Sequence, residues 1–514
     1  MNALSRAPEA STRPMDRGTA WILAAASVGM MIGRILAVDS VDLRGLEKTR
    51  LEKVRADLAA MRKSLESEGL SGVELESRLE AKRVELERQA RIRRPFLSAN
   101  DRSRWCTVRA LVEEDLRVPG APYAIDRVIQ LPLWDTIDMV KHDGHLYSSK
   151  PPLFPTLLAA PYWLIHRLTG ATLGTHPYAI GRSLLILVNV LPMVVFFWLA
   201  ARLAGRFASC DWSRLVVMTT AAFGTFLTTF AVVVNNHLPA AVCVMIALYA
   251  AVRIGFDGER RLRYFVAAGL FGALAAANEL PALAFFAALA LGLGWKDPRG
   301  TLVGFAPAAV LVAAGFFGTN WIAHRSLRPP YAHRSKTDPN DNWYRYSYER
   351  GGRQLRSYWE DPKGIDRGEP SRAVYALHAL AGHHGIFSLT PMWLLTLVGL
   401  GRWLARPSDP KQRLLALGIL AVSAACLAFY LGVAGQEDRN YGGMTCGLRW
   451  SFWLIPMWLL AALPAADLAA RRAWSRALVL VLLAWSVLSA AYPTWNPWTH
   501  PWLYDFMEHQ GWLP

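Results

Sequence analysis

One stretch of the chain holds the residue types that acid–base and phosphate chemistry need. Asp101 is followed by two arginines, and Lys150 stands directly before Pro151 and Pro152. Prolines at a helix start fix φ, so this corner presents Lys150 at a defined place. A carboxylate can take a proton from a hydroxyl, and an ammonium group can stabilise a departing phosphate. The alternative is structural: Asp101 caps a helix, and Lys150 snorkels to the edge of a membrane.

The composition defines the setting in which these residues act. The chain has 514 residues, of which 53% are hydrophobic and 19% are charged, and it contains 21 tryptophans. Apolar runs of about 20 residues recur along it, and each is long enough to cross a hydrocarbon core of about 30 Å. This pattern excludes a soluble enzyme, a disordered chain and a disulfide scaffold. It predicts an all-α polytopic membrane protein.

Eleven apolar segments qualify as spans. They are residues 18–38, 180–201, 215–234, 237–252, 264–279, 280–295, 301–323, 384–401, 414–433, 450–468 and 477–491. The first lacks a clear small-x-small cleavage site, so we interpret it as a retained helix rather than a removed signal.

A twelfth segment, Leu153–Ile165, has only about 13 residues and carries two prolines, so we expect a helix at the membrane interface.

The distribution of basic residues predicts the orientation. With eleven spans, 19 lysines and arginines fall in the loops on the side of the N-terminus, and two, Arg439 and Arg449, fall in the short connections and the tail on the other side. Positive charge is retained on the cytoplasmic side of membranes. We therefore expect a cytoplasmic N-terminus and an extracytoplasmic C-terminus. The net charge of +16 has the same explanation, so no nucleic-acid partner is expected.

The expected organisation has seven parts. These are 1–39 (N-terminus and first span), 40–94 (a helical hairpin), 95–179 (first outer loop), 180–323 (spans), 324–383 (second outer loop), 384–491 (spans) and 492–514 (a Trp-rich outer tail). In the hairpin, Leu51, Val54, Leu58, Met61 and Leu65 recur at steps of three and four, and Ser71 with Glu74 fits a capping box that opens a second helix. The hairpin is either a spacer or an arm that docks a protein partner.

The first outer loop resembles that of a known family. It resembles the GT-C superfamily of membrane glycosyltransferases in two features. One is Asp101 before a short helix, and the other is the later corner Asp143-Gly144-His145-Leu146-Tyr147-Ser148-Ser149-Lys150-Pro151-Pro152-Leu153. The nearest resemblance is to the bacterial RgtA/B/C/D-like and aminoarabinose-transferase-like enzymes, and a more distant one is to the protein O-mannosyltransferases. The specific match covers residues 100 to 155. Arg102 stands where the family usually has an acidic residue, Asn235-Asn236-His237 stands where it often has another carboxylate, and the 40–94 hairpin is an insertion.

The resemblance implies a GT-C-like fold and a transferase that moves a sugar from a polyprenyl-phosphate carrier to an extracytoplasmic acceptor, with inversion. By resemblance, Asp101 is the general base and Lys150 holds the lipid phosphate. Further candidates for the phosphate are Arg104, Arg439 and Arg449. Candidate substrate contacts are Asn100, Tyr147, Asn236, His237, Glu279, His383 and His384. A bacterial inner membrane is the expected location.

Several features keep more than one interpretation. The adjacent His383 and His384 suit a metal, a phosphate or sugar contact, or a helix entry; no further ligand set accompanies them, so no metal ligands are assigned and a need for a divalent metal stays open. The aromatic residues of 324–383 suit sugar binding or a packed cap. The tryptophans of the tail suit an aromatic belt or sugar stacking.

Two rival functions remain at this stage. A transporter or flippase for a lipid-linked or anionic solute would carry ionisable residues at mid-bilayer, whereas here the span centres are almost free of charge. A scaffold would act through the 40–94 hairpin. The sequence leaves open which sugar is transferred and whether the acceptor is a glycan, a lipid or a protein.

Overall fold

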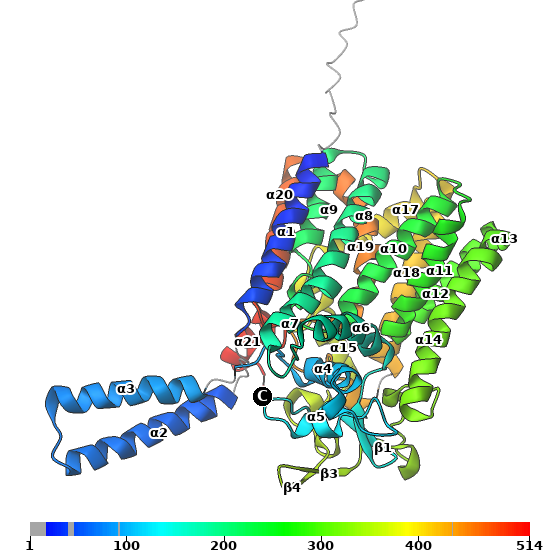
Figure 1. Ribbon diagram of the computed structural model, residues 1–514. Helices are drawn as coiled ribbons and strands as arrows, with labels where there is room; N and C mark the ends of the chain where they lie inside the picture. Colours follow the sequence, from blue (N-terminus) through cyan, green and yellow to red (C-terminus); the bar gives the residue numbers. More distant parts are fainter. Residues whose placement is uncertain (1–16, 40–45, 91–92, 434, 514) are drawn as a thin grey trace, which may run out of the picture.

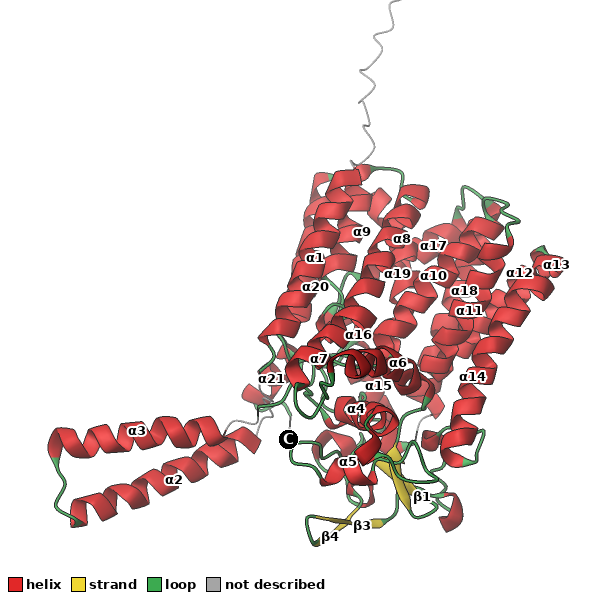
Figure 2. Cartoon of the chain, in the orientation of Figure 1, coloured by secondary structure: helices red, strands yellow, loops and turns green. Residues whose placement is uncertain are grey.

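A computed structural model describes residues 17–39, 46–90, 93–433 and 435–513. Helices dominate the described chain, and most of them run side by side in one bundle (Figures 1 and 2). Seven helical segments in this part of the chain are long and apolar enough to cross a membrane: Gly18–Ala37, Pro177–Phe207, His237–Gly255, Pro298–His324, Pro410–Val433, Arg449–Ala469 and Ala473–Ala491. The chain is therefore an all-helical, multi-pass membrane protein, as its composition predicts.

Three more of the expected spans are shorter apolar helices: α11 (Leu262–Asn278), the run η4–α12 (Leu280–Lys296) and α17 (Trp393–Ala405). The expected span 215–234 is not one helix. Helix α9 (Asp211–Phe223) ends before Gly224, and only the short 3-10 turn η3 (Thr229–Val232) follows. The hydroxyls of Thr225 and Thr228 donate to backbone carbonyls of Ala221 and Thr225. Glycine and such side-chain bonds both compete with helix continuation.

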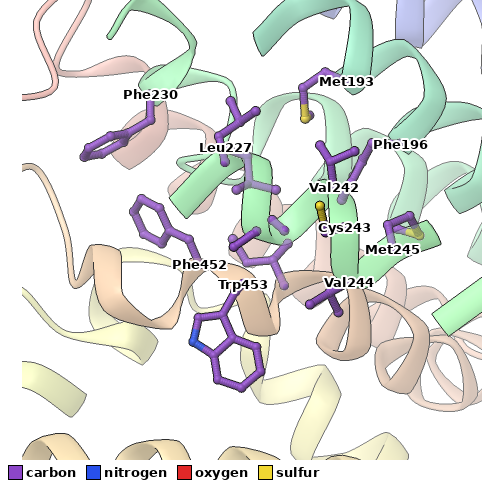
Figure 3. Close-up of a cluster of buried hydrophobic side chains, with 14 of the residues drawn as sticks. Met193, Phe196, Leu227, Phe230, Val242, Cys243, Val244, Met245, Phe452 and Trp453 are labelled. Carbon is purple, nitrogen blue, oxygen red and sulfur yellow. The ribbon is translucent and has the colours of Figure 1, made fainter. Parts of the chain in front are cut away.

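The centre of the bundle is packed with apolar side chains. Helix α10 (His237–Gly255) packs against α8 (Leu191–Phe207) and α11, and α19 (Ile455–Ala469) packs against α8, α9 and α17. Figure 3 shows part of this core, in which Met193 and Phe196 of α8 lie near Val242 and Cys243 of α10. Phe452 and Trp453 enter it from the 3-10 segment η12 (Arg449–Leu454). This core supports the residues at the end of the bundle where α10 begins.

A cap of short elements covers that end, which is the lower end in Figure 1 and is called the loop-bearing end below. The cap contains α4 (Ala99–Val112), α5 (Asp126–Gln130), α6 (Leu153–Thr169) and α15 (Arg372–Leu380). Its two β-hairpins are β1–β2 (Met139–His142 and His145–Ser148) and β3–β4 (Ser347–Arg350 and Arg353–Arg356). These four strands are an addition to the all-helical expectation.

The expected interfacial segment is helix α6, which crosses the direction of the spanning helices (Figure 1). Leu158, Ala159 and Tyr162 face the protein, whereas Leu157, Leu164 and other apolar side chains on the remaining surface are exposed. A buried cluster ties α6 to α4: the hydroxyl of Tyr162 donates to Glu113 over 2.6 Å, and Glu113 also accepts from Arg109 over 2.7 Å. The orientation of α6 is thereby fixed by a paired buried charge.

The described part of the expected hairpin at 40–94 consists of two helices, and residues 40–45 and 91–92 lie outside the described residues. Helices α2 (Leu46–Ser67) and α3 (Gly72–Ala90) run antiparallel and stand away from the bundle (Figure 1). Leu65, Leu75 and Leu79 bury one another between them, and Arg62 pairs with Glu76 across the hairpin at 2.7 Å. Helix α3 begins directly after Ser71, where the sequence places a cap.

The aromatic residues of the second expected loop are mostly a packed cap rather than a free surface. Trp343, Tyr344 and Tyr346 are buried, and the Trp343 ring stacks between His142 and His333 with centroids 4.0 and 3.6 Å away. The tail after α20 (Ala473–Ala491) also packs back on the bundle. Trp498 is buried there, and helix α21 (Trp502–His509) follows.

The remaining helices and turns complete the bundle and the connections between these parts. They are α1 (Arg17–Ala37), α7 (Pro177–Leu185), α13 (Pro298–Gly300), α14 (Ala306–His324), α16 (Ile386–Leu389) and α18 (Pro410–Ala428), with π-helical runs η2 (Ile186–Val190), η5 (Thr301–Phe305) and η10 (Phe429–Val433). Short 3-10 turns are η1 (Glu114–Leu116), η6 (Pro330–Ala332), η7 (Pro339–Asp341), η8 (Tyr358–Glu360), η9 (Gly364–Arg367) and η11 (Gln436–Asp438).

The contact between α17 and α19 yields a stability test. A Cβ on Gly399 of α17 would lie 1.9 Å from the carbonyl oxygen of Ala461 in α19. Gly399→Val should therefore force the helices apart and lower the free energy of unfolding by about 1–3 kcal/mol, the usual cost of overpacking. Gly401→Val is the matched control, because a Cβ on Gly401 meets no atom within 4 Å. Equal melting temperatures of the two variants in detergent would contradict this packing.

Candidate functional site

A cavity of about 880 Å³ lies at the loop-bearing end of the bundle. Its wall comes from α4, the segment before β1, the start of α6, the start of α10, the turn between α11 and α12, η10 and the residues that lead into η12. Charged side chains of both signs line it: Arg94, Arg102, Arg104, Lys150, Arg334 and Arg449, with Asp135, Asp138, Glu279, Asp366, Glu437 and Asp438. Segments far apart in the sequence thus meet around one polar space.

A lysine–aspartate pair forms one side of the cavity. The ammonium nitrogen of Lys150 lies 3.0 and 2.8 Å from the two carboxylate oxygens of Asp138. Asn100 donates to the same carboxylate over 2.9 Å, and the hydroxyl of Ser149 donates to it as well. Burial alone would raise the pKa of Asp138, but the charge of Lys150 and these hydrogen bonds hold it below its usual value. Burial lowers the pKa of Lys150, and Asp138 offsets part of that change.

A chain of hydrogen bonds forms the floor of the cavity. Arg104 donates to the side-chain oxygens of Asn100 and Asn236. Asn236 in turn donates to Glu279 over 2.6 Å, and Glu279 also contacts Nδ1 of His237. The other ring nitrogen of His237, Nε2, lies 2.6 Å from Nη1 of Arg449. Because arginine only donates, His237 accepts at Nε2 and carries its proton on Nδ1, which donates to Glu279.

Local sequence explains why Glu279 and Arg449 reach the cavity. Pro281 has no backbone N–H with which to continue the hydrogen bonds of α11, and α11 ends at Asn278, with Glu279 extended at the break before the turn η4. Arg449 donates from Nε and Nη2 to the carbonyl of Gly442 over 3.0 and 2.6 Å. Gly442 has φ of +92°, and a Cβ there would lie 2.4 Å from Nε of Arg449. Glycine is required at this position.

One side of the cavity is apolar and open. Leu157 of α6, Leu280 of η4, and Phe429 and Val433 of η10 all line it. These four side chains are also exposed, with 53%, 45%, 41% and 71% of their surface accessible. The cavity therefore reaches the apolar outside of the bundle between α6, η4 and η10. Its other rim is polar, with the partly exposed side chains of Asp135, Arg334 and Asp438.

Asp101 does not line this cavity. Its side chain is buried, and its two oxygens accept the backbone N–H groups of Leu97 over 3.2 Å and Val234 over 2.9 Å. The Ser98 hydroxyl accepts the backbone N–H of Asp101, so the pair closes the first turn of α4 much as a capping box does. Burial raises the pKa of Asp101 to about 7, a value that suits a base. Its position, however, corresponds to the capping alternative.

The other candidates from the sequence divide into two groups. Seven of them line the cavity: Lys150, Arg104, Arg449, Asn100, Asn236, His237 and Glu279. Arg439, Tyr147, His383 and His384 do not. The guanidinium of Arg439 is bound to the carbonyls of Glu369 and Pro370, because the chain 436–442 packs there. Tyr147 packs edge-on against His324, and His384 stacks on Tyr441 and is hydrogen-bonded to the carbonyl of Thr445.

Asp138 is the main residue that sequence reasoning missed, although a signal for it exists. Asp143-Gly144 is a typical two-residue hairpin turn, and both residues have positive φ (47° and 82°). This turn pairs Met139 with Ser148, so the residues just outside the hairpin, Asp138 and Lys150, become neighbours. Asp366 and Arg334 also line the cavity and were missed, because their segments carry no comparable local signal, whereas Tyr344 and Trp359 belong to the aromatic residues of 324–383 for which sugar binding was one interpretation.

Within the described residues, no group of three or more His, Cys, Asp or Glu side chains is arranged to hold a metal ion. No family model, no curated protein and no solved structure matches the chain. The function must therefore be argued from the cavity itself.

The placement of Asp101 predicts a structural effect of its mutation. Asp101→Asn turns one acceptor oxygen into an NH₂ group that faces a backbone N–H, so a buried donor loses its partner. The free energy of unfolding should fall by about 1–3 kcal/mol. The control is Asp115→Asn, an exposed carboxylate in η1 just after α4. Thermal unfolding in detergent measures both, and an unchanged melting temperature for Asp101→Asn would argue against the capping role.

Proposed function

We propose that the protein is a GT-C-like membrane glycosyltransferase that moves a sugar from a polyprenyl-phosphate carrier to an acceptor bound in this cavity. The observation that carries the proposal is the juxtaposition of two unlike surfaces. Lys150, Arg104 and Arg449 line the same cavity as the exposed apolar side chains of α6, η4 and η10. A ligand with an anionic head and a long apolar tail has the chemistry that such a cavity would recognise.

The polar rim supports entry of an acceptor from the aqueous side. Asp135, Arg334, Asp438 and Trp359 lie there, and the Arg334 guanidinium is 5.4 Å from the centre of the Trp359 ring. Polar groups beside an aromatic ring suit a sugar or another hydroxyl-bearing molecule. The donor would thus arrive from the lipid and the acceptor from water, with the reacting atoms meeting at the Asp138–Lys150 wall.

In this proposal Asp138 takes the part of general base that the family resemblance assigns to Asp101. Asp138 lines the cavity, whereas the oxygens of Asp101 are occupied by backbone N–H groups. The acceptor oxygen attacks the anomeric carbon while Asp138 takes its proton, and the bond from that carbon to the lipid phosphate breaks. Arg104, Arg449 and Lys150 stabilise the phosphate as it leaves with the electron pair. A single displacement of this kind inverts the anomeric centre.

The orientation that we propose places the cavity outside the cytoplasm. Four connections that carry basic residues lie at the end of the bundle opposite the cavity (Figure 1). They join α8 to α9, α10 to α11, α17 to α18, and α19 to α20. Positive charge at that end favours a cytoplasmic location for it. The eleven-span count and a bacterial inner membrane are parts of the same proposal.

The base assignment predicts a large kinetic effect. Asp138→Asn keeps the size of the side chain and a hydrogen bond to Lys150 but cannot take the proton. Transfer from a polyprenyl-phosphate sugar should fall by roughly two to four orders of magnitude. Asp143→Asn is the matched control, because Asp143 lies five residues away in an exposed turn where asparagine is equally suited. Near-normal transfer by a folded Asp138→Asn protein would remove Asp138 from the reaction.

The orientation is tested separately with alkaline phosphatase fusions in a bacterium. Fusion after Pro514 should give an active phosphatase, and fusion at Gly258, between α10 and α11, an inactive one. The reverse pattern would place the cavity on the cytoplasmic side and would exclude a donor presented from outside.

A further inference from the structure

The three cations that line the cavity floor and the adjacent wall differ in what holds them. Arg104 is bound to Asn100 and Asn236, and Arg449 is bound to His237 and the carbonyl of Gly442. All of these acceptors are neutral, and the hydrogen bonds fix both guanidinium groups in place. Lys150 differs from these two arginines, because its ammonium group is bound to the carboxylate of Asp138. An anion that enters the cavity meets two fixed arginines and one lysine that already has an anionic partner.

The three side chains that bind the Asp138 carboxylate also differ in how firmly they are held in place. Asn100 belongs to α4 and Ser149 is buried, so both hydrogen bonds to the carboxylate come from fixed groups. Lys150 reaches Asp138 through a four-carbon stem whose rotamers can change, while Pro151 and Pro152 hold its backbone. Lys150 can therefore leave without loss of the position of Asp138. While Lys150 stays, its ammonium group donates to one carboxylate oxygen and lies 2.8 Å from the other, and its charge opposes protonation of the carboxylate.

We propose that the Lys150–Asp138 pair couples donor binding to activation of the base: an anionic phosphate headgroup in the cavity draws Lys150 away from Asp138, and only then can Asp138 accept a proton. The inference rests on the proposed function, and it adds an order of events. The acceptor is deprotonated only after a phosphate has bound, so the enzyme does not activate an acceptor hydroxyl, or water in its place, while the donor site is empty.

The chemical step balances without a further reactant. The acceptor O–H bond breaks and its proton goes to Asp138, a new bond forms from the acceptor oxygen to the anomeric carbon, and the bond from that carbon to the phosphate oxygen breaks. The carrier leaves as a phosphate monoester with one more negative charge than the diester. That added charge stays beside Lys150, Arg104 and Arg449. When the carrier departs, Lys150 returns to Asp138 as the carboxyl gives up its proton to water.

Other charged and titratable groups also face Asp138 and must stay constant in any test. They are Arg104 from α4, Arg449 from η12, Asp366 from η9, and Tyr344 and Tyr346 from the segment before β3. A comparison that changes only Lys150, or only the phosphate, leaves this background the same.

The test reads the protonation of Asp138 directly and needs no turnover. A hydrophobic carbodiimide labels protonated carboxyl groups, and mass spectrometry of the peptide with Asp138 gives the pH of half-labelling in the intact detergent-solubilised protein. Geranylgeranyl phosphate serves as the probe, and its binding is measured separately by native mass spectrometry. In the wild-type protein, the probe should raise the pH of half-labelling by about one unit or more, the effect of losing a close opposite charge.

Two variants separate coupling through Lys150 from the probe's own charge. Lys150→Met should raise the half-labelling pH without any probe, and most of the further rise on adding the probe should disappear. Lys150→Arg keeps the charge and should resemble the wild type before the probe is added. If Lys150→Met does not fold, Lys150→Gln, which also removes the charge, takes its place, and an unmoved half-labelling pH in the wild-type protein with bound probe still overturns the coupling.

Each outcome decides between the two proposals. If the probe binds and the half-labelling pH of Asp138 does not move, or if it moves equally in Lys150→Met, the coupling is overturned and the proposed function stands. If the probe does not bind the wild-type protein, the anion site fails, and the proposed function and the coupling fail together.

Discussion

Charged side chains that are buried at one end of an apolar bundle must find partners, and this requirement organises the structure. An unpaired charge in a low-dielectric interior costs several kcal/mol, so each one is met by a carboxylate, an amide, an imidazole or a carbonyl. The chain of contacts runs from Lys150 through Asp138, Asn100, Arg104 and Asn236 to Glu279, His237 and Arg449, and it satisfies this requirement with residues from α4, α10, η12 and four connections. The same contacts hold these elements together around the cavity.

Breaks in regular structure bring the chain's polar groups to this place. Pro281 ends α11 so that Glu279 lies at a bend, Pro151 and Pro152 end the β1–β2 hairpin segment beside Lys150, and Gly442 lets its carbonyl approach Arg449. The π-helical run η10 adds Phe429 and Val433 to the wall, and such runs are frequent at functional sites. Each break interrupts a helix or strand where a continuous element would have carried its side chains past the cavity.

In the two aspartates of the first loop, the pKa and the position relative to the cavity point to different residues. Asp101 has a pKa raised by burial to about 7, but its oxygens bind the N–H groups of Leu97 and Val234, and it closes the start of α4. Asp138 has a pKa below the usual value because Lys150 is bound to it, yet it is the one that lines the cavity. Under the proposed coupling, removal of Lys150 by a phosphate is what makes Asp138 a competent base. In this proposal, the position of the carboxyl and the ability of its partner to leave matter more than its pKa while Lys150 is bound.

The sequence by itself determined the class of protein, because apolar runs of about 20 residues and their polar connections follow from local hydrophobicity alone. It also predicted a hairpin at 40–94 and a helix after Pro152, since caps, prolines and the three- and four-residue spacing of apolar side chains act over a few residues. Seven of its candidate site residues line the cavity. Five further candidates do not line the cavity: Asp101, Arg439, Tyr147, His383 and His384. The sequence analysis also did not find Asp138 as a partner of Lys150. Two features depend on contacts between residues 39 to 212 positions apart: which face of a helix turns toward a cavity, and which backbone carbonyls bind a guanidinium group. Only the tertiary structure decided those, because the free energy of a buried charge depends on all the groups around it and not on its neighbours in sequence.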